Sequence, residues 1–173
     1  MKNLVIGQSG GPTAVINASL YGAVKAFKES GTDGHVLGMI NGIEGFLADH
    51  VMDLSTDLSD EELELLKLTP AAYLGSCRYK LPADLESEVY PAIFDNFREM
   101  NIGYFLYVGG NDSMDTVDKL SRYAEKIGSD VKFIGIPKTI DNDLVLTDHT
   151  PGFGSAAKYV ASTVREIAID ASV

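Results

Sequence analysis

The chain has 173 residues, 45% of them hydrophobic, with 25 acidic against 14 basic side chains and a net charge of −11. This predicts one globular domain with at most part of a second, and the acidity argues against nucleic-acid or anionic-membrane partners. No apolar run approaches the ~18 residues of a membrane-spanning helix or forms a secretory signal. Because Cys77 is the single cysteine, an internal disulfide and a cysteine-based zinc site are excluded, and we expect a cytoplasmic protein.

Short apolar runs alternate with longer segments of helical periodicity. The expected strands are residues 4–6, 35–40, 104–108 and 131–136, and the expected helices are residues 14–30, 59–66, 84–100 and 113–127, with a last helix beginning near Gly154. Ser59 and Glu62 have the spacing of a capping box. The β-α-β-α order predicts an α/β fold with a doubly wound, mostly parallel sheet.

Three polar segments that contain glycine or proline each begin where a predicted strand ends. They are GQSGGPT (residues 7–13), GGNDSMD (109–115) and PKTIDND (137–143). One such segment alone is explained equally well by a structural turn. Because the carboxyl ends of parallel strands lie along one edge of a sheet, we expect all three to meet in one ligand site.

Neither common nucleotide-binding loop is present, since the sequence lacks G-x-x-x-x-G-K-[ST] and the spacing of G-x-G-x-x-G. A phosphate is therefore expected to meet backbone N–H groups in the glycine turns and the positive ends of helices that begin near Ala14 and Ser113. The acidic residues of these turns then act either as magnesium ligands or neighbours, or as groups that exclude a larger ligand.

The segment PKTIDND carries the most specific chemistry. Lys138 is expected to meet a phosphate, and Thr139 to donate a hydrogen bond. Asp141 and Asp143 offer two carboxylates, of which one can accept a proton from an attacking hydroxyl while the other orients a sugar or holds magnesium-bound water. General base catalysis of this kind contributes ~10² to 10⁴ in rate, and positioning with charge neutralisation supplies the rest of a phosphoryl transfer.

The motifs GGPTAVINA, LGSCR, GGNDS, PKTIDND and GFGSAAKYV occur in an order and spacing that resemble the 6-phosphofructokinase family. The resemblance covers nearly the whole chain and implies a Rossmann-like donor-binding domain. It implies that Asp141 is the base that deprotonates the 1-hydroxyl of fructose 6-phosphate, with Thr139 and Asp143 beside the sugar. The donor-binding residues that it implies are Gly11, Arg78, Gly110, Asn111, Asp112, Ser113 and Lys138, and Lys138 is expected to be catalytic together with Asp141.

The resemblance also bears on the phosphoryl donor. Family members that use ATP typically have glycine at the positions of Asp112 and Lys138, whereas members that use pyrophosphate have Asp and Lys. This chain has the second pair, which implies a reversible, glycolytic transfer from pyrophosphate to fructose 6-phosphate. The implied cofactor is Mg²⁺, with Asn111 and Asp143 as ligands, although the family commonly has Asp at the position of Asn111. The alternatives are an ATP-dependent 6-phosphofructokinase and an inactive ligand-binding fragment.

The resemblance implies two domains, and this chain contains one of them with a piece of the other. Residues 1–143 are expected to form the donor-binding domain, and residues 144–173 the start of a sugar-phosphate-binding domain. A Met-Gly-Arg segment that contacts the sugar phosphate in the family is absent from the chain, which is therefore expected to be an amino-terminal portion. The family implies a homo-oligomer, a dimer or a tetramer, for the full-length protein.

Overall fold

The computed structural model describes residues 2–172, so Met1 and Val173, the outer ends of the two predicted domains, lie outside the described range. A five-stranded sheet in the order β3-β2-β1-β4-β5 forms the centre of the molecule. Its strands are β1 (Asn3–Gln8), β2 (Val36–Met39), β3 (Val51–Asp53), β4 (Ile102–Gly109) and β5 (Lys132–Pro137). β3 runs antiparallel at one edge and the other pairings are parallel. The predicted doubly wound, mostly parallel α/β fold is confirmed.

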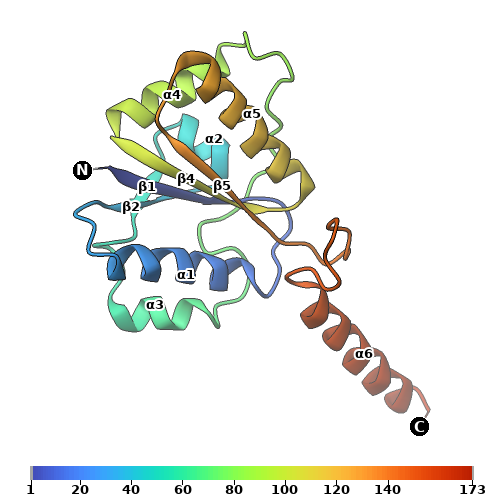
Figure 1. Cartoon of the computed structure of the whole chain (residues 1–173). Coiled ribbons are helices and arrows are strands. Elements are labelled where there is room, and N and C mark those ends of the chain that lie inside the picture. The colour runs from blue at the N-terminus through green and yellow to red at the C-terminus, as the bar shows by residue number, and fades with distance from the viewer. Residues whose placement is uncertain (1, 173) are drawn as a thin grey trace.

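Helices cover both faces of the sheet (Figure 1). One face carries α1 (Ile16–Glu29) and α3 (Asp60–Leu66), and the other carries α2 (Gly42–Leu47), α4 (Val89–Glu99) and α5 (Asn111–Ile127). Since side chains alternate along a strand, Val5 packs into the core against α4 while Ile6 packs into the core against α1. Burial on both faces explains why the strands are continuous apolar runs rather than alternating ones.

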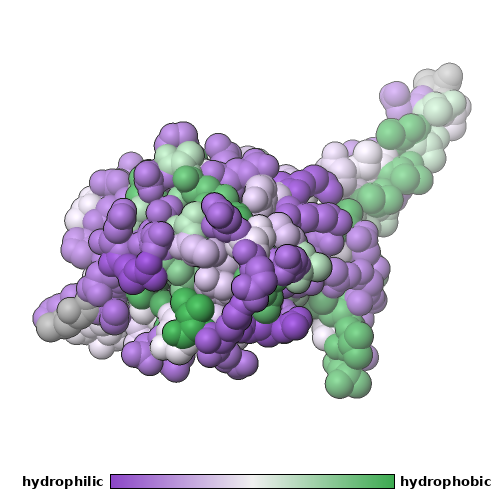
Figure 2. Space-filling view, turned by 90° about the horizontal axis from the view of Figure 1, so that it is seen from above, coloured by the Kyte–Doolittle hydropathy of each residue, from purple (hydrophilic) through white to green (hydrophobic). Residues whose placement is uncertain are grey.

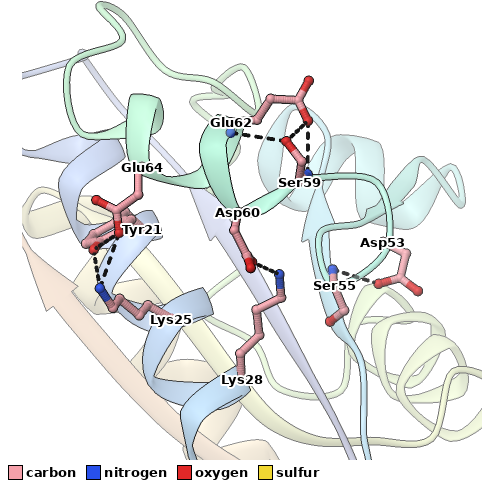
Figure 3. A network of polar contacts seen from close by, with 9 residues as sticks. All are labelled: Tyr21, Lys25, Lys28, Asp53, Ser55, Ser59, Asp60, Glu62 and Glu64. Atoms are coloured by element: carbon pink, nitrogen blue, oxygen red, sulfur yellow. Dashed lines mark hydrogen bonds and ion pairs between the residues drawn. The ribbon is translucent and has the colours of Figure 1, made fainter.

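Polar contacts join α1 to α3 on the surface (Figure 3). Tyr21 Oη donates to the Glu64 carboxylate at 2.7 Å, and Lys25 Nζ reaches the same carboxylate at 3.2 Å. At the start of α3, Ser59 and Glu62 form the predicted capping box, in which each side chain accepts from the backbone N–H of the other residue. These surface contacts add to the packing of Leu63 and Leu66 into the core that α3 shares with α1.

The helix predicted from residue 84 begins five residues later, at Val89. The Asp84 carboxylate accepts from the N–H of Glu86 at 2.9 Å, which holds residues 84–87 in a turn. Pro91 is the third residue of α4, in the first turn, where its missing N–H costs no intrahelical bond. A helix that began at residue 84 would have placed this proline in its interior.

The last helix, α6 (Phe153–Asp170), projects away from the sheet (Figure 1) and contains no buried residue. Its exposed hydrophobic side chains are Tyr159, Val160, Val164, Ile167 and Ile169. Figure 2 shows hydrophobic surface along this projecting arm. Within residues 2–172 no helix is both long and apolar enough to cross a bilayer. The predicted domain boundary at residues 143 and 144 falls in the loop between β5 and α6, and it stays a prediction.

Candidate active site

A cleft of about 440 Å³ opens at the carboxyl ends of β1, β4 and β5. The strand order reverses between β1 and β4, and doubly wound sheets bind ligands at such a point. Residues 9–13, 77–79, 110–113, 138–141 and Asp143 line the cleft, so the predicted convergence of the three strand-end segments is confirmed. The predicted site residues among them are Gly11, Arg78, Gly110, Asn111, Asp112, Ser113, Lys138, Thr139, Asp141 and Asp143. Their roles stay predictions.

The glycine turn after β1 is held against the segment that carries Arg78. Gly10 has φ +73°, a conformation that glycine adopts without strain. Its N–H donates to the carbonyl oxygen of Cys77 at 3.2 Å, and its own carbonyl oxygen accepts from Ser76 Oγ at 2.5 Å. A Cβ placed on Gly11 would meet no atom within 4 Å. One side of the turn is therefore anchored, and the other is open to a ligand.

Lys138 reaches this turn from the opposite side of the cleft. It follows β5, is only 4% exposed, and its Nζ donates to the carbonyl oxygen of Gly11. Burial lowers the pKa of Lys138 below its ordinary value, and the positive charge of Arg78 lowers it further. Two cationic side chains thus line the same cleft close enough to affect each other, which is favourable only when an anion lies between or beside them.

Asp112 stands at the rim of the cleft, in the first turn of α5. Its carboxylate pairs with Lys80 Nζ at 3.2 Å, and both side chains are about three-quarters exposed, at 75% and 73%. Sequence analysis did not identify Lys80, because a single lysine after Arg78 and Tyr79 forms no recognisable pattern. An exposed pair of this kind contributes little stability.

The predicted metal ligands Asn111 and Asp143 are in contact: Asn111 Nδ2 donates to Asp143 Oδ2 at 2.7 Å. Within residues 2–172 no group of three or more His, Cys, Asp or Glu side chains is placed to hold a metal ion. Mg²⁺, however, is usually bound by one or two carboxylates together with water and substrate phosphates. Asp143 with the side-chain oxygen of Asn111 fits that mode, after rotation of the Asn111 amide, and does not form a closed site.

The turn that carries Asp141 is held by its own side chains and by the start of α6. Thr139 Oγ1 accepts from the N–H of Asp141 at 3.0 Å, and the N–H of Thr139 donates to the carbonyl oxygen of Pro151 at 3.0 Å. Asn142, at φ +54°, accepts from the N–H of Thr150 at 3.0 Å. These bonds occupy the backbone and leave the exposed Asp141 carboxylate facing the cleft, where it can accept a proton from a bound hydroxyl.

Thr13 lines the cleft and was not identified by sequence analysis. Its Oγ1 is buried and has no hydrogen-bond partner within the described part of the chain. A Cβ on Gly152 would come within 3.1 Å of the Thr13 side chain, so Gly152 permits the close approach of the α6 N-terminus to the glycine turn. A buried hydroxyl without a partner is costly.

The chain as a whole is similar to known proteins of one family. The family model described as phosphofructokinase matches residues 3–173. A pyrophosphate–fructose 6-phosphate 1-phosphotransferase of Halomonas elongata is 46% identical over 171 residues, which cover 97% of this chain and 40% of the relative. A sulfofructose kinase of Alkalicoccus urumqiensis is 40% identical over 167 residues, which cover 96% of this chain and 42% of the relative.

The chain also resembles solved structures of this family in its fold. The crystal structure of a pyrophosphate-dependent phosphofructokinase from Nitrosospira multiformis matches with a TM-score of 0.90 at 42% identity, over 98% of this chain and 42% of that one. This chain spans about 40% of the length of the curated relatives that it matches. Since the family model matches nearly its entire length, the chain belongs to the phosphofructokinase family.

Proposed function

We propose that this chain provides the phosphoryl-donor site and the catalytic base of an enzyme that transfers a phosphoryl group from pyrophosphate to the 1-hydroxyl of fructose 6-phosphate. The observation that carries the proposal is the pair Asp112 and Lys138 on the walls of one cleft, which also contains Asp141. The 46% identity to a pyrophosphate–fructose 6-phosphate 1-phosphotransferase supports the same donor and acceptor.

The cleft suits a short, highly charged donor. Lys138 and Arg78 supply positive charge, and the Gly10–Gly11 turn permits close approach of the backbone. Asp112 adds a negative charge at the rim, on the path that the remainder of a nucleotide would take, so repulsion disfavours ATP while the cations favour pyrophosphate. An ATP-dependent 6-phosphofructokinase is the weaker alternative because both residues oppose it.

In the proposed reaction, the Asp141 carboxylate takes the proton of the 1-hydroxyl while that oxygen attacks the nearer phosphorus of pyrophosphate. A new P–O bond forms to the sugar, and the bond to the departing phosphate breaks with its electron pair. Thr139 and the backbone bonds around it hold Asp141 in place. A magnesium ion held by Asn111 and Asp143 would offset charge on the phosphate oxygens.

The exposed apolar face of α6 fits the proposed start of a second, sugar-phosphate-binding domain at residues 144–173. In that arrangement the complete enzyme places the acceptor across the cleft from the donor. We propose that it acts in glycolysis in the cytoplasm as a homo-oligomer. If the chain has no activity alone, the inactive ligand-binding fragment of the alternative describes its behaviour, and the donor site remains testable by binding.

Thermal unfolding with different ligands tests the proposal. A ligand that binds the folded state at a hundredfold excess over its dissociation constant stabilises it by about 2.7 kcal/mol. We expect magnesium with pyrophosphate to raise the midpoint, and magnesium with ATP to leave it unchanged. A rise with ATP and none with pyrophosphate would contradict the proposed donor. Fructose 6-phosphate alone reports how much of the acceptor site lies in this chain.

A further inference from the structure

We infer that Gln8 and Asn17 are positioning residues: their buried amides hold residues 69–78 against the glycine turn and so place Arg78 in the cleft. The two residues stand at either end of the turn after β1, Gln8 as the last residue of β1 and Asn17 as the second residue of α1. Neither contacts the cleft. That Arg78 meets pyrophosphate rests on the proposed function, whereas the positioning itself does not.

The two side chains are almost completely buried, with Gln8 at 0% and Asn17 at 1% exposure. Gln8 Nε2 donates to Asn17 Oδ1 at 2.9 Å and to the carbonyl oxygen of Ile16 at 3.1 Å. This closes the base of the turn that contains Gly10 and Gly11. Because a buried amide is costly unless it is satisfied, such a pair in the core requires more partners.

Those partners come from one distant segment. Asn17 Nδ2 donates to the carbonyl oxygens of Thr69 and Ala71, each at 2.8 Å, and Asn17 Oδ1 accepts from the N–H of Tyr73 at 2.9 Å. Gln8 Oε1 accepts from the N–H of Leu74 at 2.9 Å. Both amides thus use their donors and acceptors, and four of these bonds reach residues 69–74.

The segment needs this support because it has no regular structure of its own. Residues 69–76 belong to no helix or strand, and Ala71 has φ +64°, a left-handed conformation that a residue with a Cβ keeps only when its surroundings impose it. After Leu74 come Ser76, whose hydroxyl donates a hydrogen bond to the carbonyl oxygen of Gly10, and Cys77, which forms an isolated backbone β-bridge with Ser9. The polar contacts therefore lead directly to Arg78.

The reactivity of Cys77 provides a test that needs no ligand. This residue is the only cysteine of the chain, is 6% exposed and precedes Arg78. We expect Asn17→Ala and Asn17→Asp to speed its labelling by an aromatic disulfide reagent in the native chain about tenfold, because both variants lose the bonds to Thr69 and Ala71. The aspartate keeps the shape of the side chain and loses its N–H donors, so it distinguishes the loss of the hydrogen bonds from the effect of a cavity.

Asn3→Ala is the matched control. Asn3 also joins two segments, since its side chain donates to the carbonyl oxygen of Met100 at 2.8 Å and accepts from the N–H of His35 at 2.9 Å, but it lies at the other end of β1. Even where Asn3→Ala is destabilised as much as the Asn17 variants, we expect its Cys77 to react at the wild-type rate. Equal rates in the Asn3 and Asn17 variants would overturn the inference, and so would no change in either.

Two additions keep the outcome decisive. If neither Asn17 variant folds, Gln8→Met carries the same test, because it keeps the side-chain length and loses the hydrogen bonds. A wild-type labelling rate would then overturn the inference.

Titration with magnesium pyrophosphate separates the inference from the proposed function. Weaker binding by Asn17→Ala, but not by Asn3→Ala, supports both. No binding by the wild-type chain defeats the proposed donor, whereas the labelling result still decides the positioning role.

Discussion

Lys138 Nζ donates a hydrogen bond to the carbonyl oxygen of Gly11, 127 residues earlier in the chain. The bond joins the turn after β5 to the turn after β1, across the carboxyl edge of β4, which lies between them in the sheet. It keeps a cationic side chain at 4% exposure on the wall of the cleft. Lys138 is thus held before a donor arrives, which lowers the entropy lost when it binds a phosphate.

Replacement of Lys138 by alanine is expected to weaken binding of magnesium pyrophosphate about 10- to 100-fold, the equivalent of one charge-assisted hydrogen bond. Lys119→Ala is the control. Lys119 is also poorly exposed and also donates to a backbone carbonyl, that of Leu81 at 3.0 Å, but outside the cleft. Calorimetric titration measures both variants, and an equal loss of affinity in the two would refute a direct role for Lys138.

The lowered pKa of Lys138 predicts two opposite pH dependences. Between this lowered pKa and the ordinary 10.5, the unfolded chain binds more protons than the folded chain, so the contribution of Lys138 to the free energy of unfolding rises with pH. Pyrophosphate needs the ammonium form, so its affinity falls as the pH rises through the lowered pKa. Lys138→Arg stays protonated and shares the titration of pyrophosphate itself. We therefore expect the affinity of the wild type for pyrophosphate to fall more steeply at alkaline pH than that of Lys138→Arg. Coincident pH profiles would contradict the lowered pKa of Lys138.

Two valines in helices test whether α6 packs on the rest of the chain. Val24 in α1 is 0% exposed and Val164 in α6 is 60% exposed. Val24→Ala is expected to lower the free energy of unfolding by about 1.5–3 kcal/mol, and Val164→Ala to change it by less than about 0.5 kcal/mol. Urea unfolding measures both. A comparable loss at Val164 would contradict the exposed position of α6.

Asp141→Asn separates catalysis from binding. The amide keeps the shape of the side chain and cannot accept the proton, so the complete enzyme should lose ~10² to 10⁴ of its turnover. The dissociation constant for pyrophosphate should change little, since Asp141 faces the acceptor in the proposed reaction. Turnover is measured as pyrophosphate-dependent formation of the sugar bisphosphate, and a full rate in the variant would remove Asp141 as the base.

Much of the fold could be predicted from the pattern of hydrophobic residues and from the residues that begin and end helices. The four parallel strands are apolar runs, and the capping box marks the start of α3. α2 and β3 were not predicted, because residues 42–47 and 51–53 are too short for a periodic pattern. Their structure depends on context: β3 exists because it pairs with β2, and α2 because its buried face packs against α4.

The site was predictable where its residues follow strands, and not where they depend on distant contacts. Gly11, Asn111 and Lys138 were placed by the rule that strand ends meet, and the resemblance to a family added Arg78. The pair of Lys80 with Asp112 was missed because a single lysine forms no recognisable pattern and its partner is far along the sequence. The support from Asn17 to residues 69–73 was missed because hydrogen bonds to backbone carbonyls leave no pattern in the partner sequence.

The most direct measurement is a titration of the wild-type chain and of the double variant Asp112→Gly, Lys138→Gly with magnesium pyrophosphate and with magnesium ATP. We predict that the wild type binds pyrophosphate and not ATP, and that the double variant loses affinity for pyrophosphate and gains affinity for ATP, because the repelling carboxylate and the attracting cation are both gone. Binding of ATP by the wild type as tightly as pyrophosphate would contradict the proposed donor, and a double variant that still rejects ATP would place donor selection elsewhere.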